Sequence, residues 1–291
     1  MASFDDRDGF IWYNGKLTPW RDTKIHVLSH GLHYASAVFE GVRVYNGKIF
    51  KNTEHNQRLI KSGELLGFKI PYTLEQLDAA CEEVVKANNV VNGYIRPIAW
   101  RGSEMIAVSA QNCTIHVAIA TWEWPSYFGK EAKEKGLKLA WADWKRPSPD
   151  TEPTAAKAAG LYMICTLSKH SAEAKGYNDA LMLDYRGYVA EATGANVFFV
   201  MKNGEIHTPK PDCFLDGITR RTVIGLAKDL GYKVVERHIK PEELADATEA
   251  FLTGTAAEVT PIGSVENHTF KVGEVCHKLM AAFDKLVGRS S

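Results

Sequence analysis

A single lysine in a run of small residues is the stretch of this sequence with the clearest chemical potential. Residues 154–162 read TAAKAAGLY, so Lys157 has alanines on both sides and Tyr162 follows five positions later. Small neighbours let a flat ring approach the backbone, and burial lowers the pKa of an amine toward neutrality, as a Schiff-base lysine requires. The same residues also fit an ordinary helix start, because Ala favours helices and Thr154 could cap one.

Two further stretches have the features of phosphate-binding turns. Residues 215–219 (LDGIT) place backbone N–H groups and a hydroxyl at an expected helix start, where the dipole favours anions. Residues 253–257 (TGTAA) follow an expected strand, and their small side chains let a ligand approach the backbone. A helix cap and a tight turn explain each stretch nearly as well when it is taken alone.

Glu191 and two histidines complete the set of candidate polar residues. Glu191 ends an expected strand, where its carboxylate could keep a pyridine nitrogen protonated. A solvated strand-end glutamate is the equally simple alternative. His30 and His33 could bind a metal, but no third ligand follows at a suitable spacing. We therefore expect structural histidines and no metal site.

The composition excludes several classes of protein. Lys plus Arg (35) balances Asp plus Glu (35), so no basic field would attract nucleic acid or anionic membranes. No apolar run approaches the roughly 20 residues of a membrane span, and the N-terminus lacks the order of a signal peptide. Five scattered cysteines without a CxxC motif favour reduced thiols and a cytoplasmic location. We expect a partner that is a small molecule.

The 291 residues favour two domains, the first over residues 1–125. Its Asn14-Gly15 and Asn46-Gly47 dipeptides lie between β-forming runs and predict hairpins with type I′ turns. Residues 29–41 mix aromatic residues, histidines and glycines, which suits a pocket rim better than a regular element. The other expected elements are helices over 55–66 and 74–86, the second opened by a Thr73–Gln76 capping box, and strands over 93–100 and 114–120.

Residues 126–136 are interpreted as the interdomain loop and a possible lid, and residues 137–291 as a larger domain that carries the lysine. One helix is expected to start at the lysine stretch and stop at Gly176, and another to run from Gly217 to Gly231. The strands expected here cover residues 137–141, 180–184, 188–191, 196–200, 205–208 and 250–253.

Taken together, these stretches resemble the fold-type IV, pyridoxal-phosphate-dependent aminotransferases, specifically the branched-chain amino-acid aminotransferase family. The resemblance runs from about Ile11 to Phe283. It implies a mixed α+β fold of two domains, a smaller N-terminal α+β domain and a larger β-rich C-terminal domain with helices, with the active site between them. The blocks that carry it are His33-Tyr34, 39–43 (FEGVR), 55–59 (HNQRL), 94–97 (YIRP), 154–157 (TAAK), 217–220 (GITR) and 253–258 (TGTAAE).

The resemblance also implies roles for individual residues, beginning with the cofactor, pyridoxal 5′-phosphate. Lys157 matches the Schiff-base lysine, Glu191 the partner of the pyridine nitrogen, and Tyr162 the partner of the phenolic oxygen. The other implied cofactor-binding residues are Arg58, Asn196, Leu215, Ile218, Thr219 and Thr255, of which Arg58, Ile218, Thr219 and Thr255 match the phosphate cup. The implied substrate-binding residues are Tyr34, Phe39, Gly41, Tyr94, Arg96, Tyr127, Ala256 and Ala257. In the family, Tyr34 and the loop near Val108 reach the neighbouring subunit's site, so a homodimer is implied.

The implied activity is transfer of the amino group of L-leucine, L-isoleucine or L-valine to 2-oxoglutarate by a ping-pong mechanism. A D-amino-acid or (R)-amine aminotransferase and an aminodeoxychorismate lyase are alternatives on the same fold, and Tyr94, Arg96 and the 255–257 turn favour the branched-chain activity. Lys157, Tyr162 and Glu191 together argue against a non-catalytic binding protein. Two features depart from the family pattern and bear on the substrate: the loop 101–108 lacks the usual glycine-rich sequence and carries Arg101, and Ala195 stands where a glutamate often occurs.

Overall fold

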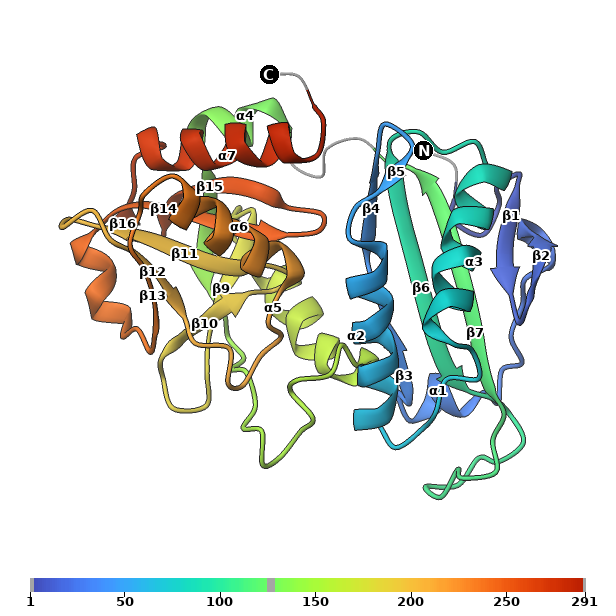
Figure 1. The fold of residues 1–291 in the computed structure, drawn as a ribbon. Coiled ribbons are helices and arrows are strands. Elements are labelled where there is room, and N and C mark those ends of the chain that lie inside the picture. The colour runs from blue at the N-terminus through green and yellow to red at the C-terminus, as the bar shows by residue number, and fades with distance from the viewer. Residues whose placement is uncertain (1–2, 125–128, 290–291) are drawn as a thin grey trace. The chain divides into compact units, whose positions relative to one another are not determined.

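The computed structural model describes residues 3–124 and 129–289 of the chain (Figure 1). The chain divides into two compact units. The first unit comprises residues 1–125 with 156–160, and the second comprises residues 126–155 with 161–291. Among the described residues, every helix falls short of the length and apolar character that a bilayer crossing demands.

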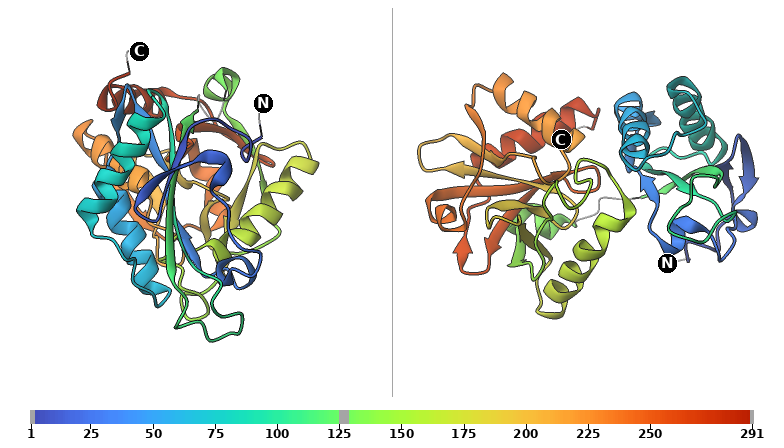
Figure 2. Two further views of the ribbon diagram at one scale, coloured as in Figure 1. Left: turned by 90° about the vertical axis from the view of Figure 1, so that its right-hand side faces the viewer. Right: turned by 90° about the horizontal axis from the view of Figure 1, so that it is seen from below.

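The first unit is built on one seven-stranded sheet and two long helices. Its strands follow the order β2-β1-β7-β6-β4-β5, and β3 pairs with β6. Helices α2 and α3 cover one face of the sheet, where Leu59 and Leu77 share a buried cluster with Ile95 and Ile119 (Figures 1 and 2). The bounds are β1 Phe10–Tyr13, β2 Lys16–Pro19, η1 Trp20–Asp22, α1 His30–His33, β3 Ala37–Phe39, β4 Val42–Tyr45, β5 Lys48–Ile49, α2 Asn52–Leu65, α3 Leu74–Ala87, β6 Gly93–Arg101 and β7 Ile115–Glu123.

The hairpins and the capping box of this unit are confirmed. Asn14 and Gly15 have φ of 48° and 95°, and Asn46 and Gly47 have φ of 49° and 75°. These positive values are what a type I′ turn needs. Thr73 and Gln76 form the predicted capping box of α3.

The segment 29–41 is more regular than expected. It contains α1 and β3, and β3 forms because the fully buried Val38 pairs across to Ala99 in β6. The interpretation of this segment as irregular was therefore wrong for these residues.

The second unit is built on a nine-stranded sheet that closes on itself. The order is β10-β9-β8-β15-β14-β11-β12-β13, β16 pairs with β15, and an additional pairing of β10 with β11 completes a ring. Leu139, Val197, Leu252 and Ile262 belong to its buried cluster, as expected for a small ring filled by side chains. The bounds are α4 Lys130–Lys135, β8 Leu137–Trp141, η2 Ala159–Tyr162, α5 Met163–Ala174, β9 Asp179–Leu183, β10 Val189–Ala192, β11 Asn196–Met201, β12 Ile206–Pro209, α6 Ile218–Asp229, β13 Val234–Arg237, η3 Pro241–Asp246, β14 Ala247–Gly254, β15 Glu258–Val265, β16 His268–Thr269 and α7 Glu274–Leu286.

Helices pack on the strands of this ring and complete the unit. Helix α5 lies against β8 and β9, α6 and α7 lie against β14, and α4 and α7 lie against β15 (Figure 1). A smaller α+β part and a larger β-rich part with helices were predicted, and both are confirmed.

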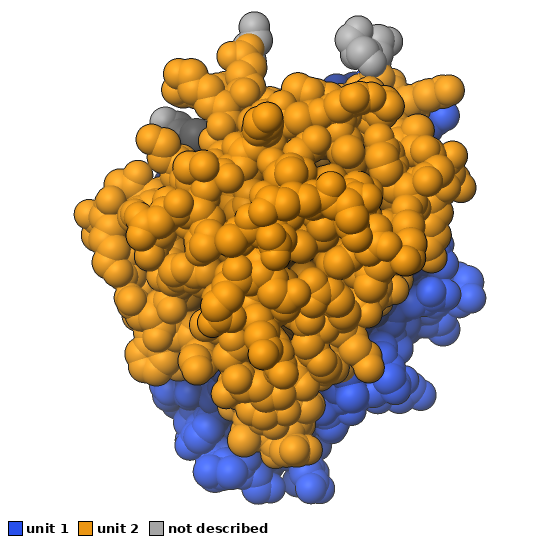
Figure 3. All heavy atoms as spheres, turned by 90° about the vertical axis from the view of Figure 1, so that its left-hand side faces the viewer, with its two compact units in different colours: residues 1–125, 156–160 blue, residues 126–155, 161–291 orange. Residues whose placement is uncertain are grey.

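The surroundings of Lys157 differ from the expected organisation. Residues 156–160 belong to the first unit (Figure 3) because the Phe39 N–H donates to the Lys157 carbonyl at 3.1 Å and Val38 bridges to Ala158. The prediction that the lysine stretch starts a helix was therefore wrong, and α5 begins at Met163. Part of the expected interdomain loop is helical, since residues 130–135 form α4.

Candidate active site

Lys157 is held by its own backbone against the first unit. Its N–H donates to the hydroxyl of Ser62 in α2 at 3.0 Å, and its carbonyl accepts from Phe39. The flanking Ala156 and Ala158 are buried, whereas Ala155 and Gly160, farther from the lysine in the motif, are exposed. The Lys157 Nζ lies 5.0 Å from the centroid of the Phe39 ring. Burial, with the nearby charge of Arg58, lowers the pKa of the Lys157 amine to about 8.

A buried ion network surrounds Arg58 in the same unit. Arg58 donates from Nε and Nη2 to the two carboxylate oxygens of Glu40, at 2.6 and 2.9 Å. The His55 Nδ1 lies 2.7 Å from Glu40 Oε2. Burial opposes ionisation of Glu40, but Arg58 and His55 hold the pKa of this carboxyl well below its usual range. Burial also lowers the pKa of His55, so Glu40 and Arg58 carry the opposing charges of the network.

Arg96 lies among aromatic side chains. Its guanidinium carbon lies 4.9 Å from the Phe39 ring centroid and 5.4 Å from that of Tyr94, and its Nη2 donates to the Tyr94 hydroxyl at 3.3 Å. The buried Arg96 Nε has no hydrogen-bond partner among the described residues. Gly41 leaves room for this arrangement, because a Cβ there would lie 1.8 Å from the Tyr94 hydroxyl oxygen. The first unit thus places a cation and apolar rings near Lys157.

The remaining predicted residues of the first unit lie near the loop 101–112. The Tyr34 ring stacks on His30 at 4.5 Å between centroids, and its hydroxyl donates to the Ile106 carbonyl at 3.3 Å. Arg101 donates to the carbonyls of Ala110, Leu66 and Gly67, so it anchors this loop. His30 contacts Ser36 and the Ala107 carbonyl through its two ring nitrogens, in agreement with a structural role. The predicted Tyr127 lies outside the described residues.

In the second unit, Glu191 is held by partners on both of its carboxylate oxygens. Glu191 on β10 faces Asn196 on β11 across the pairing that closes the ring, and the Asn196 amide donates to Glu191 Oε2 at 3.1 Å. The same amide donates to the Leu215 carbonyl at 3.0 Å. The buried Arg146 brings its Nε within 3.5 Å of Glu191 Oε1. Glu191 is therefore a buried member of a network and not a solvated strand end.

The first turn of α6 presents free donors next to this network. Gly217 is the N-cap, and no side chain of the described residues caps the helix, which leaves its first N–H groups open to an anion. A Cβ on Gly217 would lie 2.2 Å from Asn196 Oδ1, so only glycine fits there. Ile218 and Thr219 are both buried at the first two helical positions. The sequence-based prediction of a phosphate-binding turn thus agrees with an uncapped helix start.

The turn 255–257 connects β14 to β15. The Thr260 hydroxyl donates to the Ala257 carbonyl at 2.6 Å and fixes one end of the turn. Thr253 is fully buried, and its hydroxyl has no partner among the described residues. Backbone amides of small residues and an unpaired hydroxyl suit the binding of an anionic group.

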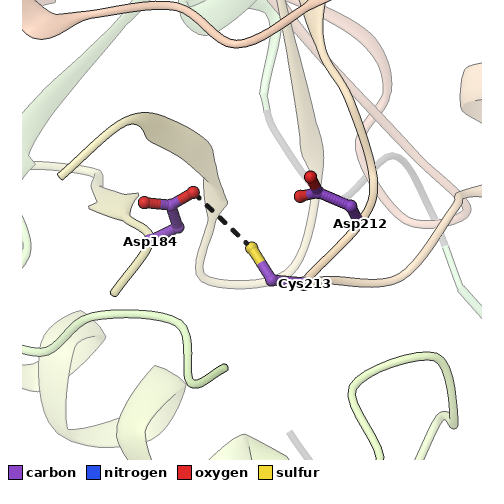
Figure 4. A group of neighbouring side chains, drawn as sticks. All are labelled: Asp184, Asp212 and Cys213. Atoms are coloured by element: carbon purple, nitrogen blue, oxygen red, sulfur yellow. Dashed lines mark hydrogen bonds between the residues drawn. The ribbon is translucent and has the colours of Figure 1, made fainter. Parts of the chain in front are cut away.

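Asp184, Asp212 and Cys213 form a small cluster (Figure 4) whose two carboxylates are already held by basic side chains. Arg186 binds Asp184 at 2.7 Å and Asp212 at 2.8 Å, and His238 lies 2.8 Å from Asp212. Burial raises the pKa of the Cys213 thiol to about 12, which leaves it protonated. The network ties the β9–β10 turn to the loop before α6.

Three residues of these networks had no role in the sequence-based prediction: Glu40, His55 and Arg146. The first two lie inside the blocks that carry the resemblance, so their positions beside Phe39 and Arg58 were the available signal. Arg146 precedes Pro147 in the sequence and carries no motif that indicates its contacts. It donates to the Leu161 carbonyl at 3.2 Å and to the Cys165 sulfur at 3.4 Å, partners that its local sequence does not indicate.

Comparison with known proteins gives one consistent family. The profile described as Amino-transferase class IV matches residues 37–265. The branched-chain-amino-acid aminotransferase of Pseudomonas aeruginosa is 42% identical over 98% of this chain and 95% of its own. The crystal structure of the Escherichia coli branched-chain amino acid aminotransferase has a TM-score of 0.93 at 38% identity, covering 98% of this chain and 97% of that one. The Thermobaculum terrenum branched-chain amino acid aminotransferase, solved in its PLP-form, has a TM-score of 0.89 at 32% identity, covering 97% and 95%.

The chain belongs to the class IV aminotransferases and, within them, to the branched-chain-amino-acid aminotransferases. Its cofactor is pyridoxal 5′-phosphate. The residues of the chain fit this group: the lysine has a lowered pKa, the start of α6 is uncapped, and a buried carboxylate is available in Glu191.

Proposed function

We propose that the protein transfers the amino group of L-leucine, L-isoleucine or L-valine to 2-oxoglutarate. The observation that carries this proposal is Arg96, whose guanidinium lies over the rings of Phe39 and Tyr94 with an unpaired Nε. Aromatic rings bury the methyl groups of an apolar side chain, and a guanidinium binds the second carboxylate of 2-oxoglutarate. The amino donor has the apolar side chain and 2-oxoglutarate has the second carboxylate, so each substrate has one of these two contacts.

The residues of the first unit handle the proton. The bound cofactor withdraws electrons from the α-carbon of the amino acid. Lys157 Nζ would serve as the base that accepts the α-proton of the amino acid, a role for which a pKa of about 8 is well suited. Arg58, held by Glu40, supplies a fixed cation for the phosphate. Tyr34, Gly41 and Tyr94 complete the proposed substrate contacts of this unit, and Tyr127, from the second unit, is a further proposed contact.

The residues of the second unit hold the cofactor and one substrate carboxylate. Glu191 keeps the pyridine nitrogen protonated, with Asn196 and Arg146 fixing its carboxylate. Tyr162 binds the phenolic oxygen. Ile218 and Thr219 at the start of α6, with Leu215 before them and Thr255, bind the phosphate through backbone and hydroxyl donors. The Ala256 and Ala257 amides bind the substrate carboxylate.

A homodimer in the cytoplasm is part of the proposal. Val27, Leu32, Tyr34, Ile106 and Val108 expose apolar surface around α1 and the loop 101–112, with Val108 85% exposed. A patch of this kind fits the interface with a second copy of the chain. The five cysteines are all free and buried, as suits a reducing compartment.

Borohydride reduction followed by peptide mapping tests the cofactor assignment. The purified protein is expected to be yellow, and reduction is expected to fix the colour on Lys157. Label on another lysine, or no label, would refute the role of Lys157. A panel of both enantiomers of leucine, valine, glutamate and alanine, with an (R)-amine, then tests the substrate. Preference for D-amino acids or (R)-amines, or release of pyruvate from aminodeoxychorismate, would favour the alternatives.

A further inference from the structure

The turn 255–257 is closed by a residue in an unusual conformation. Glu258 pairs with Gly254 across the hairpin and has a φ of +55°. Hairpin loops of three residues commonly need a left-handed residue, and glycine is the usual choice because a side chain there costs free energy. A buried glutamate therefore holds this position only if other groups fix it.

Two cations fix the Glu258 carboxylate. Arg289, three residues after α7 ends, places Nη1 2.9 Å from Glu258 Oε1, and Lys133 in α4 places Nζ 4.0 Å from Oε2. Arg289 is itself held, because its N–H donates to the Asp284 carbonyl at 2.9 Å and its guanidinium binds the Asp284 carboxylate. The space enclosed by these side chains is a cavity of only about 10 Å³. The carboxylate has little freedom to move away from these cations.

We propose that Arg289 is a positioning residue that sets the affinity for the substrate carboxylate by holding Glu258 and, through it, the turn 255–257. The inference rests on the proposed function, which assigns Ala256 and Ala257 to that carboxylate. Loss of Arg289 removes the cation at 2.9 Å from a buried side chain in a strained conformation, while Lys133 lies farther away, at 4.0 Å. The turn then samples other conformations, and its amides no longer converge on one point. The phosphate donors at the start of α6 do not depend on this clamp, whereas Thr255, the one proposed phosphate contact in the turn, does.

The test compares Arg289→Ala with Arg289→Lys, each in the wild-type chain and in a Glu258→Gly chain. Glycine adopts the left-handed conformation without a clamp, so Arg289 has nothing to hold in that background. We expect Arg289→Ala to raise KM for leucine and 2-oxoglutarate by about three- to tenfold, with kcat little changed. The pyridoxal phosphate dissociation constant should rise by a smaller factor, because Thr255 is the one proposed phosphate contact in the turn. Arg289→Lys should recover most of the loss. The Arg289→Ala rise should vanish in the Glu258→Gly chain.

Hydrogen exchange of the peptide 253–260 gives a readout that needs no substrate. Exchange there should increase in Arg289→Ala and stay at the wild-type level in Lys278→Ala, a control on α7 whose ion pair with Glu274 is exposed. An unchanged KM, an equal rise in the Glu258→Gly chain, or unchanged exchange in the turn would overturn the proposal. A wild-type protein without transaminase activity would count against the proposed function alone, since the exchange measurement would still decide whether Arg289 holds the turn.

Discussion

The two units provide polar groups in different ways. In the first, the polar groups are charged side chains that balance one another: Glu40 with Arg58, beside Lys157. In the second, they are mostly backbone groups and a carboxylate with neutral and cationic partners, at the start of α6 and at Glu191. The first arrangement adjusts the protonation of an amine, and the second has the backbone donors that would suit a bound anion. The units should therefore respond differently when one group is removed.

Removal of the amine should have the largest effect. Lys157→Ala is expected to lower the rate of the leucine half-reaction by at least about a thousandfold, because Lys157 is the group proposed to accept the α-proton. Cofactor binding through phosphate contacts should persist. Rapid-mixing absorbance of the reconstituted variant with leucine measures both quantities. Substantial release of 2-oxo acid would show that another group carries the proton.

Removal of the carboxylate charge in the second unit should have the next largest effect. Glu191→Gln is expected to lower kcat by about a hundred- to a thousandfold, the range for loss of one preorganised electrostatic group, since an amide does not keep the pyridine nitrogen protonated. The fold and cofactor content should be retained, as judged by circular dichroism and phosphate analysis. Near-normal turnover would mean that Glu191 serves only the Asn196 and Arg146 network.

Local features of the first unit followed from the sequence, and contacts between distant residues did not. The Asn-Gly hairpins and the Thr73 capping box depend on neighbouring residues, and the structure contains them as predicted. The ring itself depends on strands that are far apart in the sequence, since β8 pairs with β15 and β11 pairs with β14. Nothing local to Arg146 indicates that it reaches Glu191, 45 positions later in the chain.

The site residues divide in the same way. Lys157 and the α6 start were identified because small residues, a lysine and a glycine-led helix start are readable as short motifs. Residues 156–160 belong to the first unit because of backbone contacts with β3, which lies more than a hundred residues earlier in the chain. The motifs could therefore be recognised in the sequence, while the residues that contact them in the structure could not.

The rate at which Lys157 reacts with the cofactor aldehyde should depend on pH, because this reaction uses the amine of the first unit. The Lys157 amine must be neutral to react with an aldehyde, and its pKa is lowered to about 8. Below that pH the neutral fraction falls about tenfold per pH unit, so capture at pH 6 should be roughly a hundredfold slower than above pH 8. Stopped-flow absorbance with cofactor-free protein measures this rate.

A matched variant shows whether the first unit sets this midpoint. Glu40 raises the pKa of Lys157, so Glu40→Gln should move the midpoint to lower pH. A midpoint near the unperturbed value of 10.5 in the wild type would contradict the assignment of a buried amine.

The last prediction asks which of two arginines of the first unit, Arg96 or Arg101, binds the second carboxylate of glutamate and 2-oxoglutarate. Arg96 lies over aromatic rings with an unpaired Nε. Arg101, in contrast, already donates hydrogen bonds to three backbone carbonyls. Arg96→Ala should therefore weaken glutamate and 2-oxoglutarate by roughly 1.5–3 kcal/mol, the range for a charge-assisted hydrogen bond, and affect leucine much less. Arg101→Ala should leave both half-reactions close to wild type and loosen only the loop. Half-reactions measured separately with leucine and with glutamate distinguish these outcomes. Equal losses in both for Arg96→Ala would make it a residue of the fold, and a selective loss for Arg101→Ala would move the carboxylate site into the loop.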